Sequence, residues 1–136
     1  MNYWLVKSDP NDYSWNELKK DKETFWDGVR NYQARNFLKD MKKGDLVYVY
    51  ESVTNRDVKG IAEITKESYQ DPTTDDDRWV AVDIKFKEEL KNPVNLKEIK
   101  QVDSLQEIAL IKQSRLSVMP LTKKEFDTIY KMSEEK

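Results

Sequence analysis

Apolar and polar positions alternate with two different periods along the chain, which predicts strands as well as helices. Regular alternation, or a short continuous apolar run, is typical of a strand. By this criterion we predict strands over residues 3–7, 46–50, 58–64, 79–86 and 116–118. The run 46–50 is apolar throughout, as expected of a strand covered on both faces. We expect the last strand to end at Pro120.

Two helices are predicted in the N-terminal half. Ser14 and Glu17 have the spacing of a capping box, in which each side chain bonds the other residue's backbone N–H, so a short helix should run through about residue 20. The second helix is predicted from an apolar stripe with i, i+3, i+4, i+7 spacing, formed by Ala34, Phe37, Leu38 and Met41. Residues 42–44, Lys-Lys-Gly, supply cations and a left-handed stop.

The C-terminal third contains three cap-like starts of short helices, at Asn95, Asp103 and Thr122. The polar segments 52–57 and 71–77 are predicted to be an exposed turn and a loop. Strands interleaved with short helices favour an α+β fold, and the length fits one domain over residues 1–136. We expect the central strands to close into a small barrel with a core of Leu46, Val47, Val49, Ile61, Val82 and Ile84.

Composition excludes several chemistries. The chain has no cysteine and no histidine, so disulfides, Cys/His zinc sites and triads that use histidine as the base are excluded. Its net charge of -2 argues against a protein that coats nucleic acid non-specifically. No apolar run approaches the roughly 20 residues of a membrane helix, and we expect no membrane partner, metal or cofactor.

Residues 25–35, Phe-Trp-Asp-Gly-Val-Arg-Asn-Tyr-Gln-Ala-Arg, combine the groups that bind a nucleobase. A tryptophan face stacks on any base, and carboxylate or amide groups bond its edge. From these residues alone, the plainer interpretation is favoured: Trp26 packs in the core, and Arg30 and Arg35 lie on the surface.

Five blocks spread over nearly the whole chain resemble the signature of EVE domains. They are Tyr-Trp-Leu-Val-Lys-Ser-Asp-Pro at 3–10, Trp-Asp-Gly-Val-Arg-Asn-Tyr-Gln-Ala-Arg-Asn-Phe-Leu at 26–38, Gly-Asp at 44–45, Gly-Ile-Ala-Glu at 60–63, and Gln-Ser-Arg-Leu-Ser-Val-Met-Pro at 113–120. The resemblance implies a PUA-like fold, a small mixed or antiparallel β-barrel surrounded by short helices and related to the YTH domain. It also implies a non-catalytic reader of a modified base, chiefly modified cytosine in DNA.

The resemblance places the site in these blocks. It implies a base-binding pocket of Trp26, Ser8, Asp9, Asp27, Asn31, Tyr50 and Ser117. It implies a phosphate-binding rim of Lys7, Arg30, Arg35 and Arg115. We expect a monomer that binds DNA rather than RNA, located in the cytoplasm, with the nucleoid if bacterial, or in the nucleus if eukaryotic.

Two positions depart from the family's pattern. Asp9 stands where the family usually has glutamate, which shortens the side chain by one methylene. Glu51, between Tyr50 and Ser52, stands where the family usually has histidine. A carboxylate there argues against a phosphate contact from that loop.

Two other functions remain open at this point. An enzyme acting on modified nucleotides would use Asp9 or Asp27 as general base, although no second catalytic partner is visible beside either residue. A pocket for a peptide or metabolite also fits the acidic pI of 5.4. Three acidic residues at 75–77 could hold a hard cation, but a solvated loop is favoured. Trp4 and Trp15 are expected to be packing residues.

Overall fold

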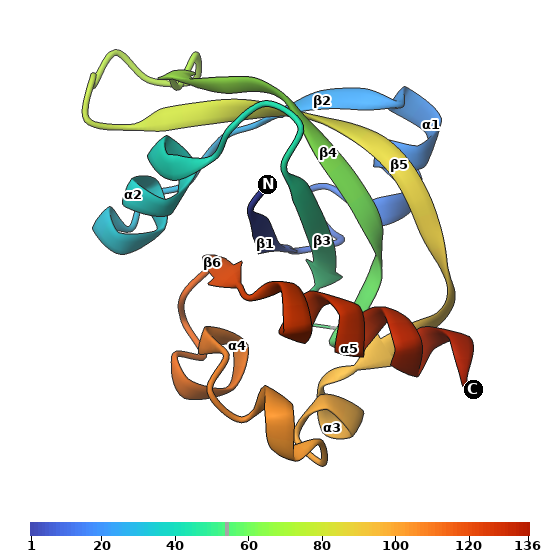
Figure 1. Ribbon diagram of the computed structural model, residues 1–136. Coiled ribbons are helices and arrows are strands. Elements are labelled where there is room, and N and C mark those ends of the chain that lie inside the picture. Colours follow the sequence, from blue (N-terminus) through green and yellow to red (C-terminus); the bar gives the residue numbers. More distant parts are fainter. Residues whose placement is uncertain (54) are drawn as a thin grey trace.

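The computed structural model describes residues 1–53 and 55–136, which form six strands and five helices with one 3₁₀ turn (Figure 1). The strands are β1 (Tyr3–Ser8), β2 (Glu23–Trp26), β3 (Leu46–Glu51), β4 (Asp57–Gln70), β5 (Val80–Asn95) and β6 (Val118–Leu121). The helices are α1 (Trp15–Asp21), α2 (Tyr32–Asp40), α3 (Leu96–Ile99), α4 (Ala109–Lys112) and α5 (Lys123–Glu134), and the 3₁₀ turn η1 spans Asp103–Leu105. The expected α+β class is confirmed.

The six strands form one mixed sheet in the order β2-β5-β4-β3-β1-β6. Only β1 and β3 are parallel; the other pairs are antiparallel. The expectation of a closed barrel is wrong, because β2 and β6 remain separate edges. Helix α2 packs against β6, β5 and β4 and lies beside the sheet (Figure 1).

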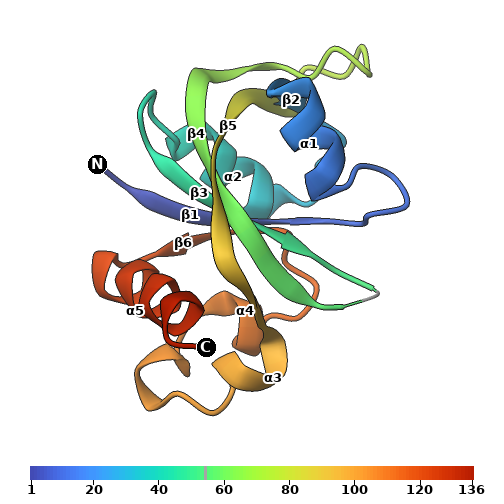
Figure 2. The same ribbon diagram turned by 90° about the vertical axis from the view of Figure 1, so that its right-hand side faces the viewer.

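Two long strands, β4 and β5, form a bent ribbon that extends the sheet well beyond the predicted segments (Figure 2). The prediction ended the second of these strands at Phe86 because exposed polar residues follow it. The pairing of β5 with β4 is interrupted by several register shifts. Such bulges bend and twist a strand. The apolar alternation is therefore lost halfway along β5, although the strand continues.

Three further differences concern one strand that was not predicted and the ends of two elements. Strand β2 was not predicted, because only four residues form it and two of them are exposed. Helix α2 ends at Asp40, before the predicted stop, and Gly44 instead has a positive φ of 94° in the following turn. Strand β6 contains Pro120 rather than ending there, which an edge strand tolerates.

Local capping signals were reliable. Ser14, Asn95 and Thr122 each form a complete capping box at the start of α1, α3 and α5. The segment at Asp103 forms only a 3₁₀ turn without a side-chain cap. The turn predicted over residues 52–57 is exposed at Val53, Asn55 and Arg56, and position 54 lies outside the described residues.

The core contains the expected strand residues Val47, Val49, Ile61, Val82 and Ile84, whereas Leu46 is only half-buried. Trp4 and Trp15 are buried, as predicted for packing residues. The Trp15 ring lies so close to Gly60 that a Cβ on the glycine would come within 2.2 Å of it. No helix in the described part of the chain is long and apolar enough to cross a membrane.

Candidate nucleic-acid interface

A cleft of about 570 Å³ opens between the segment that follows β1 and the segment that follows β2. We call residues 8–13 the first wall and residues 26–30 the second wall. The cleft is lined by Lys7, Ser8, Asp9, Asp12, Tyr13, Thr24, Phe25, Trp26, Asp27, Gly28, Val29, Arg30 and Ser117. Its volume lies in the range of small-molecule sites, and aromatic and acidic groups meet in it.

The first wall is a tight turn held by its own polar groups. The Ser8 hydroxyl donates to the carbonyl of Tyr13. The Asp9 carboxylate accepts from the backbone N–H of Asn11 at 2.9 Å, and the Asp9 carbonyl accepts from Asp12 and Tyr13 at 2.9 Å. An aspartate that bonds the backbone two residues ahead stabilises this type of turn. The wall is therefore determined largely by residues adjacent in sequence.

The end of strand β3 and the residue after it are hydrogen-bonded to the first wall and to the start of α1. The backbone N–H of Ser52 donates to the Ser8 carbonyl at 2.9 Å. The buried Glu51 carboxylate accepts from the backbone N–H of Trp15 at 2.6 Å, at the start of α1. A carboxylate at a helix N-terminus satisfies an otherwise unpaired donor. Glu51 thus has a structural partner inside the protein, consistent with the expectation that this position makes no phosphate contact.

Trp26 ends β2, where it pairs with Val82 of β5. Its side chain is only 9% exposed, yet it lines the cleft. The Tyr13 ring stands nearly perpendicular to it, at 84° and a centroid distance of 6.4 Å. Trp26 therefore packs in the core and also lines the cleft. Tyr13, which the sequence analysis did not select, adds a second aromatic face from the other wall.

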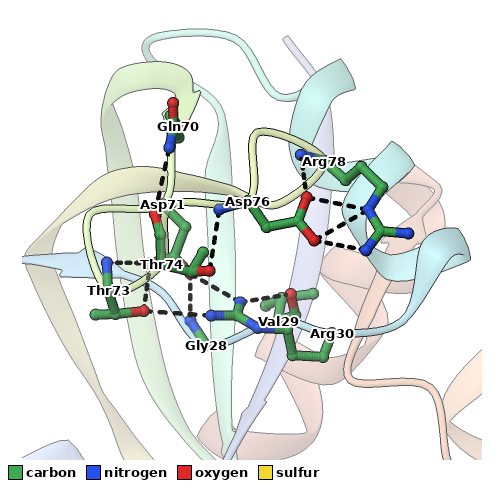
Figure 3. Close-up of polar contacts among 9 residues, drawn as sticks. All are labelled: Gly28, Val29, Arg30, Gln70, Asp71, Thr73, Thr74, Asp76 and Arg78. Carbon is green, nitrogen blue, oxygen red and sulfur yellow. Dashed lines mark hydrogen bonds and ion pairs between the residues drawn. The ribbon is translucent and has the colours of Figure 1, made fainter.

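The second wall is anchored by Asp71, a fully buried carboxylate from the loop after β4 (Figure 3). It accepts from the backbone N–H of Gly28 at 2.9 Å and from Arg30 at 2.9 Å. It also accepts from the backbone N–H and hydroxyl of Thr73, at 2.7 and 2.5 Å. Gly28 has a positive φ of 74° here, a conformation that glycine adopts without strain.

The pKa of Asp71 reflects these contacts. Burial by itself would raise the pKa, but the hydrogen bonds from Thr73, Gly28 and Arg30 outweigh it and lower the pKa to about 2. The group is therefore a permanent anion near neutral pH. Sequence reasoning missed it because the loop's composition predicts a turn but not its partner, which lies 43 residues away.

Two further predicted residues close the end of the cleft. The backbone N–H of Lys7 donates to the carbonyl of Ser117 at 2.9 Å, which joins β1 to the segment before β6. The Lys7 ammonium donates to the carbonyl of Ser114 at 2.8 Å. Partial burial lowers the pKa of Lys7. Lys7 and Ser117 thus line the same cleft as Ser8, Asp9, Trp26, Asp27 and Arg30.

Four predicted site residues lie outside the cleft. Asn31 caps α2, where its side-chain oxygen accepts from Ala34 at 2.9 Å. Asn31 and Arg115 instead line a neighbouring hollow of about 320 Å³. Arg35 points toward the loop after β4 and donates to the carbonyl of Arg78 there. Its guanidinium also lies over the ring of Tyr32, in α2. Tyr50 is buried among core residues.

The acidic run 75–77 has a structural role at Asp76. This carboxylate pairs with Arg78 at 2.6 Å, and hydrogen bonds from Arg78 lower its pKa to about 2 (Figure 3). Arg78 in turn contacts the hydroxyl of Tyr32, whose ring packs on Trp79 with centroids 5.2 Å apart. Within the described residues, no cluster of acidic side chains suitable for a metal ion is present.

The family follows from comparison with known proteins. The family model described as the EVE domain matches residues 2–132. The chain belongs to the EVE domain family. This EVE domain is 36% identical to thymocyte nuclear protein 1 of Mus musculus, over 98% of this chain and 74% of the mouse protein.

Solved structures agree with this assignment. Human THYN1 in complex with DNA containing 5-methylcytosine superimposes on this EVE domain with a TM-score of 0.93, 32% identity, and coverage of 100% of this chain and 99% of the human one. The YTH domain of the Zygosaccharomyces rouxii MRB1 protein, in complex with N6-methyladenosine RNA, has a TM-score of 0.61 at 14% identity, covering 98% and 86% of the two chains. That second likeness shows a shared fold and confirms the expected structural relation to YTH domains.

Proposed function

We propose that this protein, as a single EVE domain over residues 1–136, is a non-catalytic reader that binds a modified cytosine of DNA in the cleft between the two walls. The observation that carries the proposal is the cleft itself, which combines the Trp26 face with the carboxylates of Asp9 and Asp27. The 5-methylcytosine DNA bound by human THYN1 supports the choice of ligand.

Stacking supplies the first part of the binding energy. A base leaves its stack at a cost of a few kcal/mol, and one base on an aromatic side chain returns about 1–3 kcal/mol. Trp26 and Tyr13, from opposite walls, provide two faces in nearly perpendicular planes. Because Trp26 is mostly buried, its side chain is already ordered, and little side-chain entropy is lost when a base arrives.

The polar groups of the cleft favour an exocyclic amine. The single hydroxyl proton of Ser8 is already donated to Tyr13, so the Ser8 oxygen can only accept from a ligand. Asp9 and Asp27 are acceptors when ionised. Cytosine presents an amine donor on its edge, whereas thymine presents a carbonyl acceptor at the same position. The acceptors of the first wall therefore match the amine of cytosine better than the carbonyl of thymine.

A direct test compares DNA 12-mers that carry one 5-methylcytosine, cytosine or thymine, by fluorescence anisotropy. A methyl group that fits an apolar slot contributes about 1–3 kcal/mol, so we expect roughly ten- to hundredfold tighter binding of 5-methylcytosine than of cytosine. Thymine should bind more weakly than either. Equal affinity for all three DNAs would contradict the proposal.

The role of Trp26 is tested by Trp26→Leu. Loss of the stacking face should weaken binding by roughly ten- to hundredfold, from about 1–3 kcal/mol. Trp79→Leu is the matched control, because Trp79 does not line the cleft. Urea unfolding of both variants gives the folded fraction. If the folded Trp26→Leu protein binds as well as the wild type, Trp26 serves packing alone.

Absence of catalysis is the remaining part of the proposal. Without histidine or cysteine, proton transfer near neutral pH would require a carboxylate with a raised pKa or a lysine with a lowered one. Lys7 has the second property but donates to a backbone carbonyl. Prolonged incubation with modified DNA and divalent cations should give no new nucleoside by mass spectrometry. A product that disappears in Asp9→Asn or Asp27→Asn would establish an enzyme.

A further inference from the structure

A second hollow, of about 510 Å³, lies between the end of the β3–β4 turn and α3. We call it the basic groove. Three cationic side chains line it, Arg56, Lys97 and Lys100, together with the amides of Asn55, Asn95 and Gln101. No carboxylate belongs to its lining among the described residues. Figure 1 shows α3 at the end of the molecule opposite α2.

The positive charge of the groove is not compensated locally. Among residues 1–53 and 55–136, none of Arg56, Lys97 and Lys100 forms an ion pair, and all three are exposed. In a chain of net charge -2, three unpaired cations around one hollow are a local excess. Such an excess attracts anions.

Another lysine-rich hollow shows the contrast. It lies on α5 and is lined by Lys123, Lys124 and Lys131, but also by Asp127. Lys123 pairs with Asp127 at 2.7 Å, and Lys131 with Glu135 at 3.8 Å. These ion pairs along the helix offset two of the three lysines. The two hollows therefore have the same number of cations but different net charge.

The basic groove is connected to the cleft by one short turn. At one end, Ser52 bonds the carbonyl of Ser8 in the first wall. At the other end, the carbonyl of Arg56 accepts from the backbone N–H of Leu96 in α3 at 2.9 Å. Four residues of chain span at most about 14 Å, and successive phosphates of a DNA strand advance about 3.4 Å along the axis. The backbone of the first wall at Ser8 and the backbone of the groove at Arg56 are therefore close enough for a few nucleotides of one strand to connect the two sites.

We propose that the basic groove binds the phosphodiester backbone of the same DNA whose modified base enters the cleft, a few nucleotides from that base. This inference rests on the proposed function and adds a second contact to it. The groove contributes affinity that does not depend on the base, and the cleft contributes the discrimination. This division is typical of proteins that position DNA by phosphates and read it by base contacts.

The test is the salt dependence of binding to the 5-methylcytosine 12-mer. Each phosphate contact contributes about 0.9 to the slope of log affinity against log salt concentration. The triple variant Arg56→Gln, Lys97→Gln, Lys100→Gln should therefore lower the slope by about two to three. The ratio of affinities for 5-methylcytosine and cytosine should be unchanged.

The matched control is Lys123→Gln, Lys124→Gln, Lys131→Gln, which removes the same charge from the hollow on α5, where two of the three lysines already form ion pairs. We expect its slope to fall by less than about one, because these lysines make no phosphate contact. Thermal unfolding verifies that both variants are folded. An unchanged slope in the groove variant, or an equal fall in both variants, would overturn the inference.

The nucleoside 5-methyl-2′-deoxycytidine separates the groove from the cleft, because it has no phosphate that the groove could bind. Wild type and groove variant should bind it equally, within about twofold. Weaker nucleoside binding by the groove variant would contradict the inference. If the wild type does not distinguish 5-methylcytosine from cytosine, the proposed function fails, while the salt slopes still decide the role of the groove.

Discussion

The first wall, residues 8–13, and the second wall, residues 26–30, face the same cleft but are held by different kinds of contact. In the first wall, Ser8 and Asp9 bond backbone groups within five residues of themselves. In the second wall, Asp71 reaches Gly28 and Arg30 from 43 and 41 residues away. The first wall is therefore held mainly by local bonds, with added support from Ser52, whereas the second depends on one buried anion contributed by a distant loop.

The difference matters for the geometry of the site. Trp26, the proposed stacking face, begins the second wall, and Asp71 holds that wall two and four residues further on, at Gly28 and Arg30. A substitution of Asp71 should therefore change base binding although Asp71 itself does not line the cleft.

The largest expected effect is that of Asp71→Ala. The substitution leaves the Gly28 and Thr73 donors and the Arg30 cation without their acceptor. Unpaired buried donors cost about 1–3 kcal/mol each, and loss of one partner of a buried ion pair costs about 3–5 kcal/mol. Because Arg30 is partly exposed, we expect a loss near the lower figure, about 3 kcal/mol, in urea unfolding, together with loss of preference for 5-methylcytosine.

Asp71→Asn is the conservative partner of that variant, because the amide keeps one acceptor oxygen. Its loss of stability should be about half as large. If Asp71→Ala is as stable as the wild type, the second wall is held by contacts other than those of Asp71.

An intermediate effect is expected on acidification. The pKa of Asp71 in the folded protein is about 2, below the ordinary value of 3.8. The anion's contribution is therefore fully present above about pH 4 and is lost as the pH falls toward 2. It amounts to at most about 2 kcal/mol. Urea unfolding at several pH values should show this loss in the wild type and a smaller one in Asp71→Asn.

The smallest effect is expected from Asp9→Asn, the equivalent change in the first wall. Asparagine keeps the oxygen that accepts from Asn11 and favours the same turn. The free energy of unfolding should change by less than about 0.5 kcal/mol, while DNA binding weakens because a charged acceptor is lost. A destabilisation as large as that of Asp71→Asn would show that the two walls are held alike.

The same distinction explains what the sequence predicted. Features formed by neighbours in the chain, such as the caps at Ser14 and Thr122, were predicted correctly, because both partners are visible in one short segment. The cleft residues Ser8, Asp9 and Trp26 were found through the family blocks, and the structure brings them together. The role of Asp71 could not be predicted, since nothing near it in sequence indicates its partners.

Asn31 shows the opposite case, a predicted site residue that lies outside the cleft. Its residue type suits a base edge as well as a helix cap, and sequence alone does not show which partner takes the side-chain oxygen. The structure assigns that oxygen to Ala34. The closed barrel was similarly expected from strand patterns, which do not reveal that β2 and β6 stay unpaired with each other.

The open sheet has a consequence for how copies of this chain behave in concentrated solution. Free strand edges are templates on which another chain can add a strand and begin aggregation. Here both edge strands are only four residues long, and α5 bonds Asn92 in the part of β5 that extends beyond β2. Pro120 interrupts the donors of β6, and α2 packs against that strand. The protein thus retains an unclosed sheet while offering little edge for intermolecular β-pairing.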